Sequence, residues 1–246
     1  MIHSKRGLLL VAVLTVFLAL IVLFPARIAY WWAAPAGLDA SGLQGTVWSG
    51  KADAVAMEGI YLSDVSWRLR PLSLFAGSLA YHVNGAPISG FVEANVGIGI
   101  GGTLTVSDMT ASLPLAALAQ TLRIRGLRGD ASAQFDRLQI RDGLPIAASG
   151  SVQVSKLLVP SLSRESIGGY RAEFFTQNNG VAASVEDTDG VMELAGSLQI
   201  KDDRSYQFLA QLVAQPATPA NLRKQMEYLG PANERGQREL RIEGRL

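Results

Sequence analysis

The sequence predicts a mainly β protein, built as one curved antiparallel sheet or partly open barrel with two short helices and one N-terminal transmembrane helix. Three observations lead to this fold class. A charge-free apolar run opens the chain, apolar and polar residues then alternate with a period of two, and several of these alternations start at a glycine. These glycines, expected to open strands, are Gly45, Gly77, Gly102, Gly150 and Gly196. Alternation is typical of strands that bury one face, and glycine suits turns and bulges. The lack of strand–helix–strand alternation disfavours a parallel α/β fold.

The first element is a transmembrane helix predicted from Gly7 to Phe24, a run without any charged residue. At about 1.5 Å per residue this run spans roughly 27 Å, enough for the hydrocarbon core of a bilayer. Lys5 and Arg6 before the run outnumber Arg27 after it. The positive-inside bias therefore makes residues 1–6 a cytoplasmic stub and carries the rest of the chain across the membrane.

A cleaved signal peptide is the alternative interpretation of this run, because Ala34-Pro35-Ala36 has the small-x-small form of a cleavage site. A signal h-region is usually about 7–15 residues long and is cut close to its end, whereas this run is longer and Ala36 lies well beyond it. Tyr30, Trp31 and Trp32 also fit an aromatic belt at the membrane interface. We therefore predict an uncleaved anchor.

Residues 25–41 are predicted to connect the membrane to the folded domain. Pro35 and Gly37 make the stretch from Ala33 to Ser41 irregular. The domain, residues 42–246, is long enough to bury its own core as one unit or two smaller ones. Its clearest alternating segments are Val65–Arg70, Met192–Lys201 and Leu240–Leu246.

Two segments of the domain break the alternation and are predicted to be short helices. The first is Leu115–Leu122, which contains good helix formers. The second is Ala220–Leu229, with Thr218 as N-cap and Pro219 at the first helical position, ended by Gly230-Pro231. Each helix is followed by a predicted strand, and we interpret this repeated helix–strand order as a weak internal duplication.

Composition limits the kinds of partner and chemistry. The formal net charge of the whole chain is +1. Setting aside Lys5, Arg6 and Arg27 leaves 19 of the 22 Lys and Arg against 21 Asp and Glu, with the two signs mixed along the sequence. A nucleic-acid-binding face concentrates basic charge, so nucleic acid is not an expected partner. The chain has no cysteine, which excludes disulfide bonds, thiolate metal sites and a cysteine nucleophile.

Candidates for catalysis are few. The two histidines are His3, in the cytoplasmic stub, and His82, which is predicted to end a strand before a turn. We interpret His82 as a surface or edge residue rather than a general base. The acidic group Glu186–Gly190 is interpreted as a hairpin loop rather than a calcium site, because it lacks a second Glu at EF-hand spacing and Asp-Gly before a strand marks a turn. We expect no enzyme activity, metal or cofactor.

Three further groups have both a functional and a structural interpretation. Gly97–Gly102 matches neither a Walker loop nor a dinucleotide fingerprint, and we expect a closely approached stretch of sheet or a bulged turn. Arg123–Arg128 is expected to form a solvated strand face rather than a site for lipid headgroups or an acidic partner. Trp48 and Trp67 are expected to anchor the core face of the sheet, with an apolar ligand groove as the alternative.

Several blocks of the sequence resemble the N protein family of the bacterial type II, or general, secretion pathway. Phe24-Pro25-Ala26-Arg27 is similar to the family's Leu-Pro-Ala-Arg, and Ser41–Gly50 resembles its Gly-x-x-Gly-Thr-x-Trp-x-Gly. Trp67-Arg68-Leu69-Arg70-Pro71-Leu72 is the next similar block. Leu113-Pro114-Leu115, Leu229-Gly230-Pro231 and Gly244-Arg245-Leu246 extend the likeness over nearly the whole chain. The residues of these blocks that we single out as structural or partner-contact candidates are Pro25, Arg27, Gly45, Trp48, Gly50, Trp67, Arg68 and Pro71.

The resemblance implies a non-catalytic accessory protein of the bacterial inner membrane, with its bulk in the periplasm, that supports export of folded proteins across the outer membrane. As a scaffold it would contact other inner-membrane platform proteins or the outer-membrane secretin, for example through an unpaired strand edge. A periplasmic lipid-handling β-groove tethered to the inner membrane is the alternative, and it requires a continuous apolar concave face. A periplasmic enzyme is the weakest option because no set of catalytic residues converges.

Overall fold

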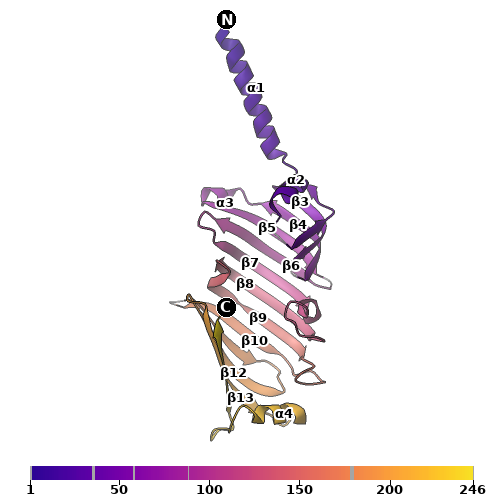
Figure 1. Cartoon of the computed structure of the whole chain (residues 1–246), viewed down its shortest axis with the longest axis vertical. Helices are drawn as coiled ribbons and strands as arrows, with labels where there is room; N and C mark the ends of the chain where they lie inside the picture. Colours follow the sequence, from indigo (N-terminus) through magenta and orange to yellow (C-terminus); the bar gives the residue numbers. More distant parts are fainter. Residues whose placement is uncertain (1, 35–36, 58, 88, 178–179, 246) are drawn as a thin grey trace.

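The structure, a computed structural model of the 246-residue chain, describes residues 2–34, 37–57, 59–87, 89–177 and 180–245 (Figure 1). Its helices are α1 (Ile2–Val22), α2 (Ala26–Ala33), α3 (Leu72–Phe75), the 3₁₀ helix η1 (Leu115–Leu118) and α4 (Ala220–Glu227). Its strands are β1 (Leu38–Ser41), β2 (Gln44–Gly45), β3 (Ser49–Met57), β4 (Ile60–Leu69), β5 (Ser78–Pro87), β6 (Phe91–Gly99), β7 (Leu104–Pro114), β8 (Arg128–Arg141), β9 (Leu144–Leu158), β10 (Tyr170–Gln177), β11 (Gly180–Asp187), β12 (Met192–Lys201), β13 (Ser205–Ala214) and β14 (Arg238–Arg245). Pro35 and Ala36 of the cleavage-site motif and the terminal Leu246 lie outside the described residues.

The strands form one 14-stranded sheet in which sequence neighbours pair antiparallel. The path begins at β1, passes through β3 and continues strand by strand to β14, with β2 paired to β3 at the side. The mainly β, antiparallel prediction is therefore confirmed. The sheet is open, since its described strands follow one linear path with β1 and β14 at the two ends.

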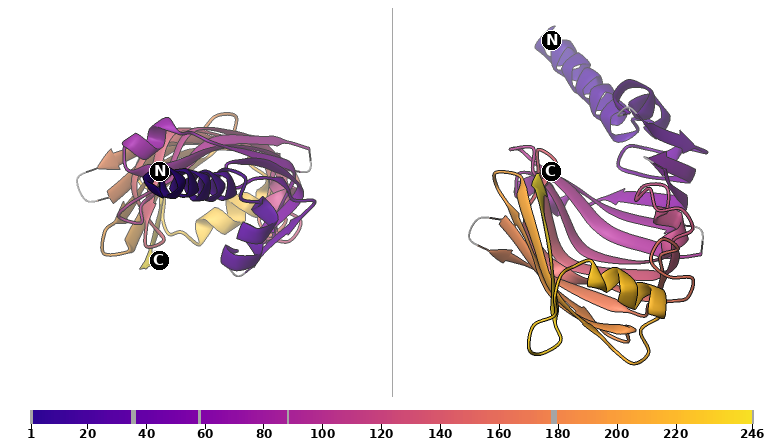
Figure 2. Two further views of the ribbon diagram at one scale, coloured as in Figure 1. Left: turned by 90° about the horizontal axis from the view of Figure 1, so that it is seen from above. Right: turned by 60° about the horizontal axis from the view of Figure 1, so that its bottom comes forward.

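The sheet is curved, and its strands are stacked along the long axis of the molecule (Figures 1 and 2). Register shifts accompany two residues with left-handed backbone, Asp64 in β4 and Asp108 in β7, both at φ 51°. Aspartate tolerates this conformation better than most residues, and an extra residue in one strand increases its bend and twist. These bulges contribute to the curl.

The best-packed core lies at the end of the sheet farthest from α1. Leu222 and Met226 of α4 are buried against Ile167, Met192 and Leu212. Figure 2 shows α4 inside the curl, so these residues define the concave face of the sheet. The second predicted helix is thus confirmed, although it ends at Glu227 instead of Leu229.

The N-cap predicted for α4 is wrong. Pro219 occupies the cap position, and no side chain caps the helix. The buried Thr218 hydroxyl instead donates to the Val191 carbonyl at 2.5 Å and accepts from the Gln215 backbone N–H at 2.8 Å. Thr218 therefore connects the start of α4 to the loop before β12. Its position before Pro219 in the sequence predicts a helix cap and not this long-range contact.

The irregular connector predicted from Ala33 to Ser41 is also only partly present. Helix α2 continues to Ala33, and Leu38–Ser41 forms strand β1 on the edge of the sheet. The Tyr30 hydroxyl of α2 donates to the Leu38 carbonyl at 2.9 Å and accepts from the Ala40 N–H at 3.2 Å. This contact fixes β1 beside α2.

The first predicted helix is shorter than expected, and the strand that follows it begins later than expected. Only Leu115–Leu118 is helical, as a 3₁₀ turn, instead of Leu115–Leu122. Residues 123–127 form turns, and β8 begins at Arg128, so the strand face predicted for Arg123–Arg128 is wrong. Leu127 is buried, which draws this segment back onto the sheet.

The glycines predicted to open strands fall into two groups. Gly77 and Gly102 have positive φ angles and precede β5 and β7, as expected. The prediction is wrong for Gly150 and Gly196. They lie inside β9 and β12, where an added Cβ would meet Phe135 at 2.6 Å and Ala210 at 3.0 Å. These two provide room for neighbouring side chains in the sheet.

Helix α1 extends away from the sheet at the β1 end of the molecule (Figure 1). In the part of the chain that the structure describes, no helix is both long and apolar enough to cross a membrane.

Candidate functional site: the junction and the concave face

The end of α1 and the start of α2 are joined to the sheet by hydrogen bonds from a separate part of the chain. The Val47 N–H donates to the Phe24 carbonyl at 3.0 Å, and Pro25 forms an isolated antiparallel bridge with Thr46. The Trp48 indole N–H donates to the Ile21 carbonyl at 2.8 Å. We call this region, residues 21–27 with residues 43–50 and Trp67, the junction.

The junction brings together six of the eight candidate residues from the sequence motifs. The Arg27 Nε–H donates to the Leu43 carbonyl at 2.7 Å, and Gly45, at φ 90°, pairs with Gly50. A Cβ on Gly50 would lie 2.4 Å from the Trp67 ring, so glycine lets the indole lie against the strand. The Trp67 indole N–H donates to the Thr46 carbonyl at 3.2 Å. The six residues are Pro25, Arg27, Gly45, Trp48, Gly50 and Trp67.

The other two candidates lie elsewhere. Arg68 is exposed and pairs with His82 on the face opposite Trp67. Pro71 precedes α3 and lines a hollow of about 780 Å³ on that same face, together with Asn95 and Arg141.

The expectation for the two tryptophans is half right. Trp67 is half-buried in β4 and lies on the concave face beside Val83. Trp48 lies in a bend between β2 and β3 and bonds to α1, so it does not anchor a strand of the core. Its alternation with Thr46 resembles a strand, but the close bonding of Thr46 to Ser49 turns the chain there.

The concave face is apolar along most of the sheet. Residues paired across antiparallel strands share a face. One row of paired residues running from β6 to β14 contains no polar side chain: Val92, Ala111, Ala133, Val152, Ala172, Val185, Gly196, Ala210 and Leu240. A parallel row from β4 to β9 is Leu69, Tyr81, Val96, Val106, Leu138 and Ala148.

The neighbouring row on the convex face has the opposite character. From β6 to β14 it reads Glu93, Thr110, Gln134, Ser151, Glu173, Ser184, Ser197, Leu209 and Arg241. Nearly all of these side chains are exposed, whereas the concave row is buried or half-buried. The curl therefore forms a trough lined with hydrocarbon and coated outside with polar groups.

At the α1 end, the trough is covered by α2. A groove of about 510 Å³ lies between α2 and strands β4 to β6, and we call it the α2 groove. Its lining is Ala26, Ala29, Tyr30, Ala33, Ala34, Leu38, Leu43, Val47, Trp67, Leu79, Tyr81, Val83, Val96 and Ile98. Burial raises the pKa of the Tyr81 phenol, as expected beside hydrocarbon. The volume is in the range of about 300–1,000 Å³ that is usual for small-molecule sites.

The sequence raised an apolar groove as the alternative role of Trp48 and Trp67, and Trp67 does line the α2 groove. The sequence did not place that groove under α2, although one signal for its position was present. Leu79, Tyr81 and Val83 alternate along β5, which predicts a strand face but not what covers it. The cover comes from α2, which sequence reasoning assigned to the connector.

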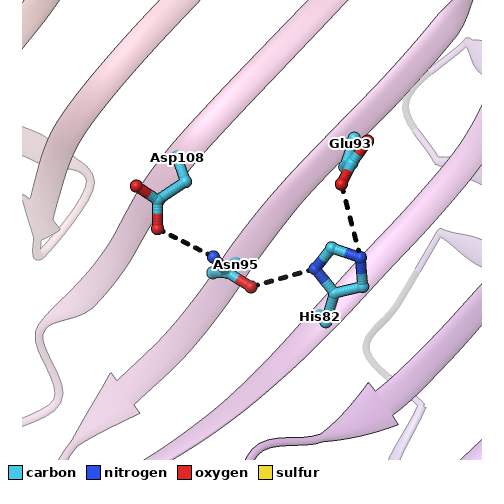
Figure 3. A network of polar contacts seen from close by, with 4 residues as sticks. All are labelled: His82, Glu93, Asn95 and Asp108. Carbon is cyan, nitrogen blue, oxygen red and sulfur yellow. Dashed lines mark hydrogen bonds and ion pairs between the residues drawn. The ribbon is translucent and has the colours of Figure 1, made fainter.

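A polar network lies on the convex face, across β5, β6 and β7 (Figure 3). His82 Nδ1 is 3.0 Å from Asn95 Oδ1, and His82 Nε2 is 3.5 Å from Glu93 Oε1. The Asn95 amide donates to Asp108 Oδ2 at 2.9 Å. His82 lies inside β5, so its predicted place at a strand end is wrong, while its partial exposure agrees with a surface residue.

The remaining acidic and glycine motifs form turns. Glu186–Gly190 spans the end of β11 and the turn to β12, which confirms the hairpin interpretation. Within the described ranges, no group of three or more His, Asp or Glu side chains is placed to hold a metal ion. Gly97 lies close to Ala80 of β5, and residues 100–103 turn into β7, so the Gly97–Gly102 interpretation is confirmed.

Comparisons with known proteins agree with the sequence motifs. The family model for type II secretion system protein N matches residues 36–241. The chain is 26% identical to the type II secretion system protein N of Vibrio cholerae serotype O1 over 219 residues, which cover 86% of each chain. It is 24% identical to the protein of the same name from Pectobacterium carotovorum subsp. carotovorum in an alignment 258 positions long that covers 90% of each chain. No solved structure matches the chain. The matched range includes both the junction strands and the trough, and the chain belongs to the type II secretion system protein N family.

Proposed function

We propose that this protein is a non-catalytic accessory component of the type II secretion system, anchored in the inner membrane by residues 7–24 with its sheet in the periplasm. Its membership of the protein N family implies a component of that system. The anchor is supported by the apolar run and by the basic residues that precede it.

The junction is the observation that favours a scaffold. A scaffold must hold its anchor and its domain in a fixed relation. The bond from Trp48 to Ile21 of α1 and the bond from Val47 to Phe24, just after α1, provide such a connection. The two ends of the open sheet, β1 and β14, each leave one strand edge for pairing with another chain. Platform proteins of the inner membrane and the outer-membrane secretin are the proposed partners.

Complementation of a deletion strain tests the scaffold. We expect deletion to lower both the assembly of the secretion complex and the amount of substrate in the medium, and the wild-type chain to restore them. Trp48→Phe removes the bond to α1 and should restore them only in part. Trp31→Phe is the matched control, since Trp31 is 85% exposed. Unchanged assembly and export after deletion would overturn the scaffold, and photocrosslinking from β14 and from Ser49 would identify its partner.

A lipid-handling role is the second candidate, and the apolar concave face favours it. The trough has rows of hydrocarbon side chains, most of which are partly exposed. Such a surface is typical of a ligand-binding face. The test is mass spectrometry of lipids that co-purify with the full chain in mild detergent. Absence of lipid above the level of an unrelated membrane protein would reject this candidate.

A further inference from the structure

We propose that the α2 groove binds one acyl chain of a membrane phospholipid, with the lipid phosphate held by Arg27. This inference rests on the lipid-handling candidate above and specifies its ligand and the part of the trough where that ligand sits.

The lining of the α2 groove disfavours an extended peptide as occupant. Its side chains are aliphatic or aromatic, and its walls are the face of a paired sheet and the side of a helix. Backbone groups there are already used in the ladder and the helix. The Tyr30 hydroxyl is also occupied, because it bonds to Leu38 and Ala40. A bound extended peptide would leave its own N–H and C=O groups without partners, each at a cost of about 1–3 kcal/mol. A hydrocarbon chain has no such groups.

The position of the groove indicates a ligand from the bilayer. The groove lies under α2, directly after the end of the apolar N-terminal run. Trp31 and Trp32, on the outer side of α2, are 85% and 75% exposed, and such amphipathic rings are favoured at headgroup level. The groove is also continuous with the trough, because Tyr81 and Val96 belong to both.

Arg27 adds a charge that matches a phosphate. Its Nε–H is bonded to the carbonyl of Leu43, a residue of the groove lining, which holds the guanidinium at the rim. The structure gives Arg27 no other partner among the residues it describes, so its remaining N–H groups are available. Guanidinium binds phosphate oxygens through paired, charge-assisted hydrogen bonds.

Photolabelling of the full chain tests the proposal. The chain is placed in vesicles of phosphatidylethanolamine and phosphatidylglycerol that contain a trace of phospholipid with a diazirine on one acyl chain. We expect labelled peptides to include Tyr81 or Val96. Ala29→Trp fills the groove and should reduce this label about tenfold, since excluding two or more methylenes changes affinity by roughly that factor. Ile28→Trp, on the exposed side of the same helix, should leave it unchanged.

Two further variants test whether a loss of label reflects misfolding and whether the phosphate of the headgroup is recognised. Ile98→Ser, at a rim residue that is 55% exposed, should also lower the label without disturbing the core. Arg27→Gln should reduce labelling by the phospholipid and not by a diazirine fatty alcohol, which lacks the phosphate.

The outcomes distinguish failure of the groove proposal from failure of the lipid-handling candidate on which it rests. In one outcome, wild type, Ala29→Trp and Ile98→Ser all carry equal label, at residues elsewhere on the concave face. That result would overturn acyl-chain binding in the α2 groove but would still support lipid handling by the trough. No label on any concave residue would overturn both. A photoreactive amino acid at residue 98 that crosslinks to a polypeptide instead of lipid would also overturn the proposal.

Discussion

At the scale of single residues, the junction depends on the space left by Gly50. Its backbone lies against the Trp67 ring and the Gln44 carbonyl, each 2.4 Å from the position of a Cβ. Trp67 in turn bonds to Thr46, which bridges to Pro25. A side chain at position 50 would therefore displace contacts between the sheet and the segment that joins α1 to α2.

Gly50→Ala is expected to destabilise the protein by about 1–3 kcal/mol, because a methyl group does not fit without a shift of backbone or indole. For a chain of this size the melting temperature falls by about 2–4 °C per kcal/mol. Thermal unfolding of the full chain in detergent measures the change. Gly101→Ala is the matched control, since nothing lies within 4 Å of its added Cβ. Equal melting temperatures for the two variants would contradict the account.

Tyr170 gives the protein a specific response to alkaline pH. Burial, and then the charges of Asp187 and Asp189, raise its pKa from 10.0 to about 12. The unfolded chain releases this proton near pH 10, whereas the folded chain keeps it until about pH 12. The stability linked to Tyr170 is therefore present below pH 10 and is lost as pH rises towards 12.

Tyr170→Phe should make the loss of stability between pH 9.5 and about 11.5 less steep, since phenylalanine has no proton to release. Denaturant midpoints at several pH values measure the slope, which is independent of the hydrogen bond to Ile167 that the variant also loses. Tyr228→Phe, at a side chain that is 83% exposed, should leave the slope unchanged. Identical slopes for wild type and Tyr170→Phe would count against this role.

At the scale of elements, α4 closes the end of the trough. Its Leu222 and Met226 cover Met192, Leu212 and Ile167, and these five side chains form one buried cluster. The segment is short, and its stability in isolation would be marginal. Packing in the curl, together with the Thr218 bond to Val191, holds it in place.

Leu222→Ala is expected to lower the free energy of unfolding by about 2–5 kcal/mol, because it leaves a cavity in this cluster. Denaturant unfolding of the full chain measures it. Leu72→Ala makes the same substitution in α3 at a side chain that is 81% exposed, and it should change stability by less than about 0.5 kcal/mol. A similarly small effect at Leu222 would show that α4 does not seal the core.

The elements also show where sequence reasoning succeeds and fails. Strands such as β12 were predicted because alternation is a local property of the chain. Helix α4 was predicted from Pro219 and Gly230, which are local signals as well. The short η1 and the turns from 123 to 127 were missed because the burial of Leu127 and the pairing of β8 compete with helix propensity. Helix α2 was missed because its stability comes from contacts with residues 43–47 and β1.

At the scale of the whole molecule, the proposed topology separates the N-terminal stub from the sheet by a membrane. The chain has no cysteine, so one introduced thiol reports on one site. Ser4→Cys marks the stub, and Ile100→Cys marks the turn after β6 at a side chain that is 93% exposed.

We expect a membrane-impermeant maleimide to label residue 100 in cells with a permeabilised outer membrane, and to label residue 4 only after the inner membrane is opened. The chain should also stay in the membrane fraction after alkaline carbonate washing. Label at residue 4 in intact inner membranes would reverse the orientation. A mature chain that begins at Gly37 would contradict the uncleaved anchor.

By itself, the sequence determined the β class, the apolar N-terminal run, and the division of each strand into an apolar and a polar face. These follow from short-range patterns, because side chains alternate with a period of two along any strand. Only the tertiary structure decided that the apolar face curls inward, since curvature arises from bulges and from register between strands. It also decided that Arg27, Trp48, Gly50 and Trp67 meet at the junction. Their spacing along the sequence does not show that they lie close together in space, because this depends on the packing of α2 against the first strands.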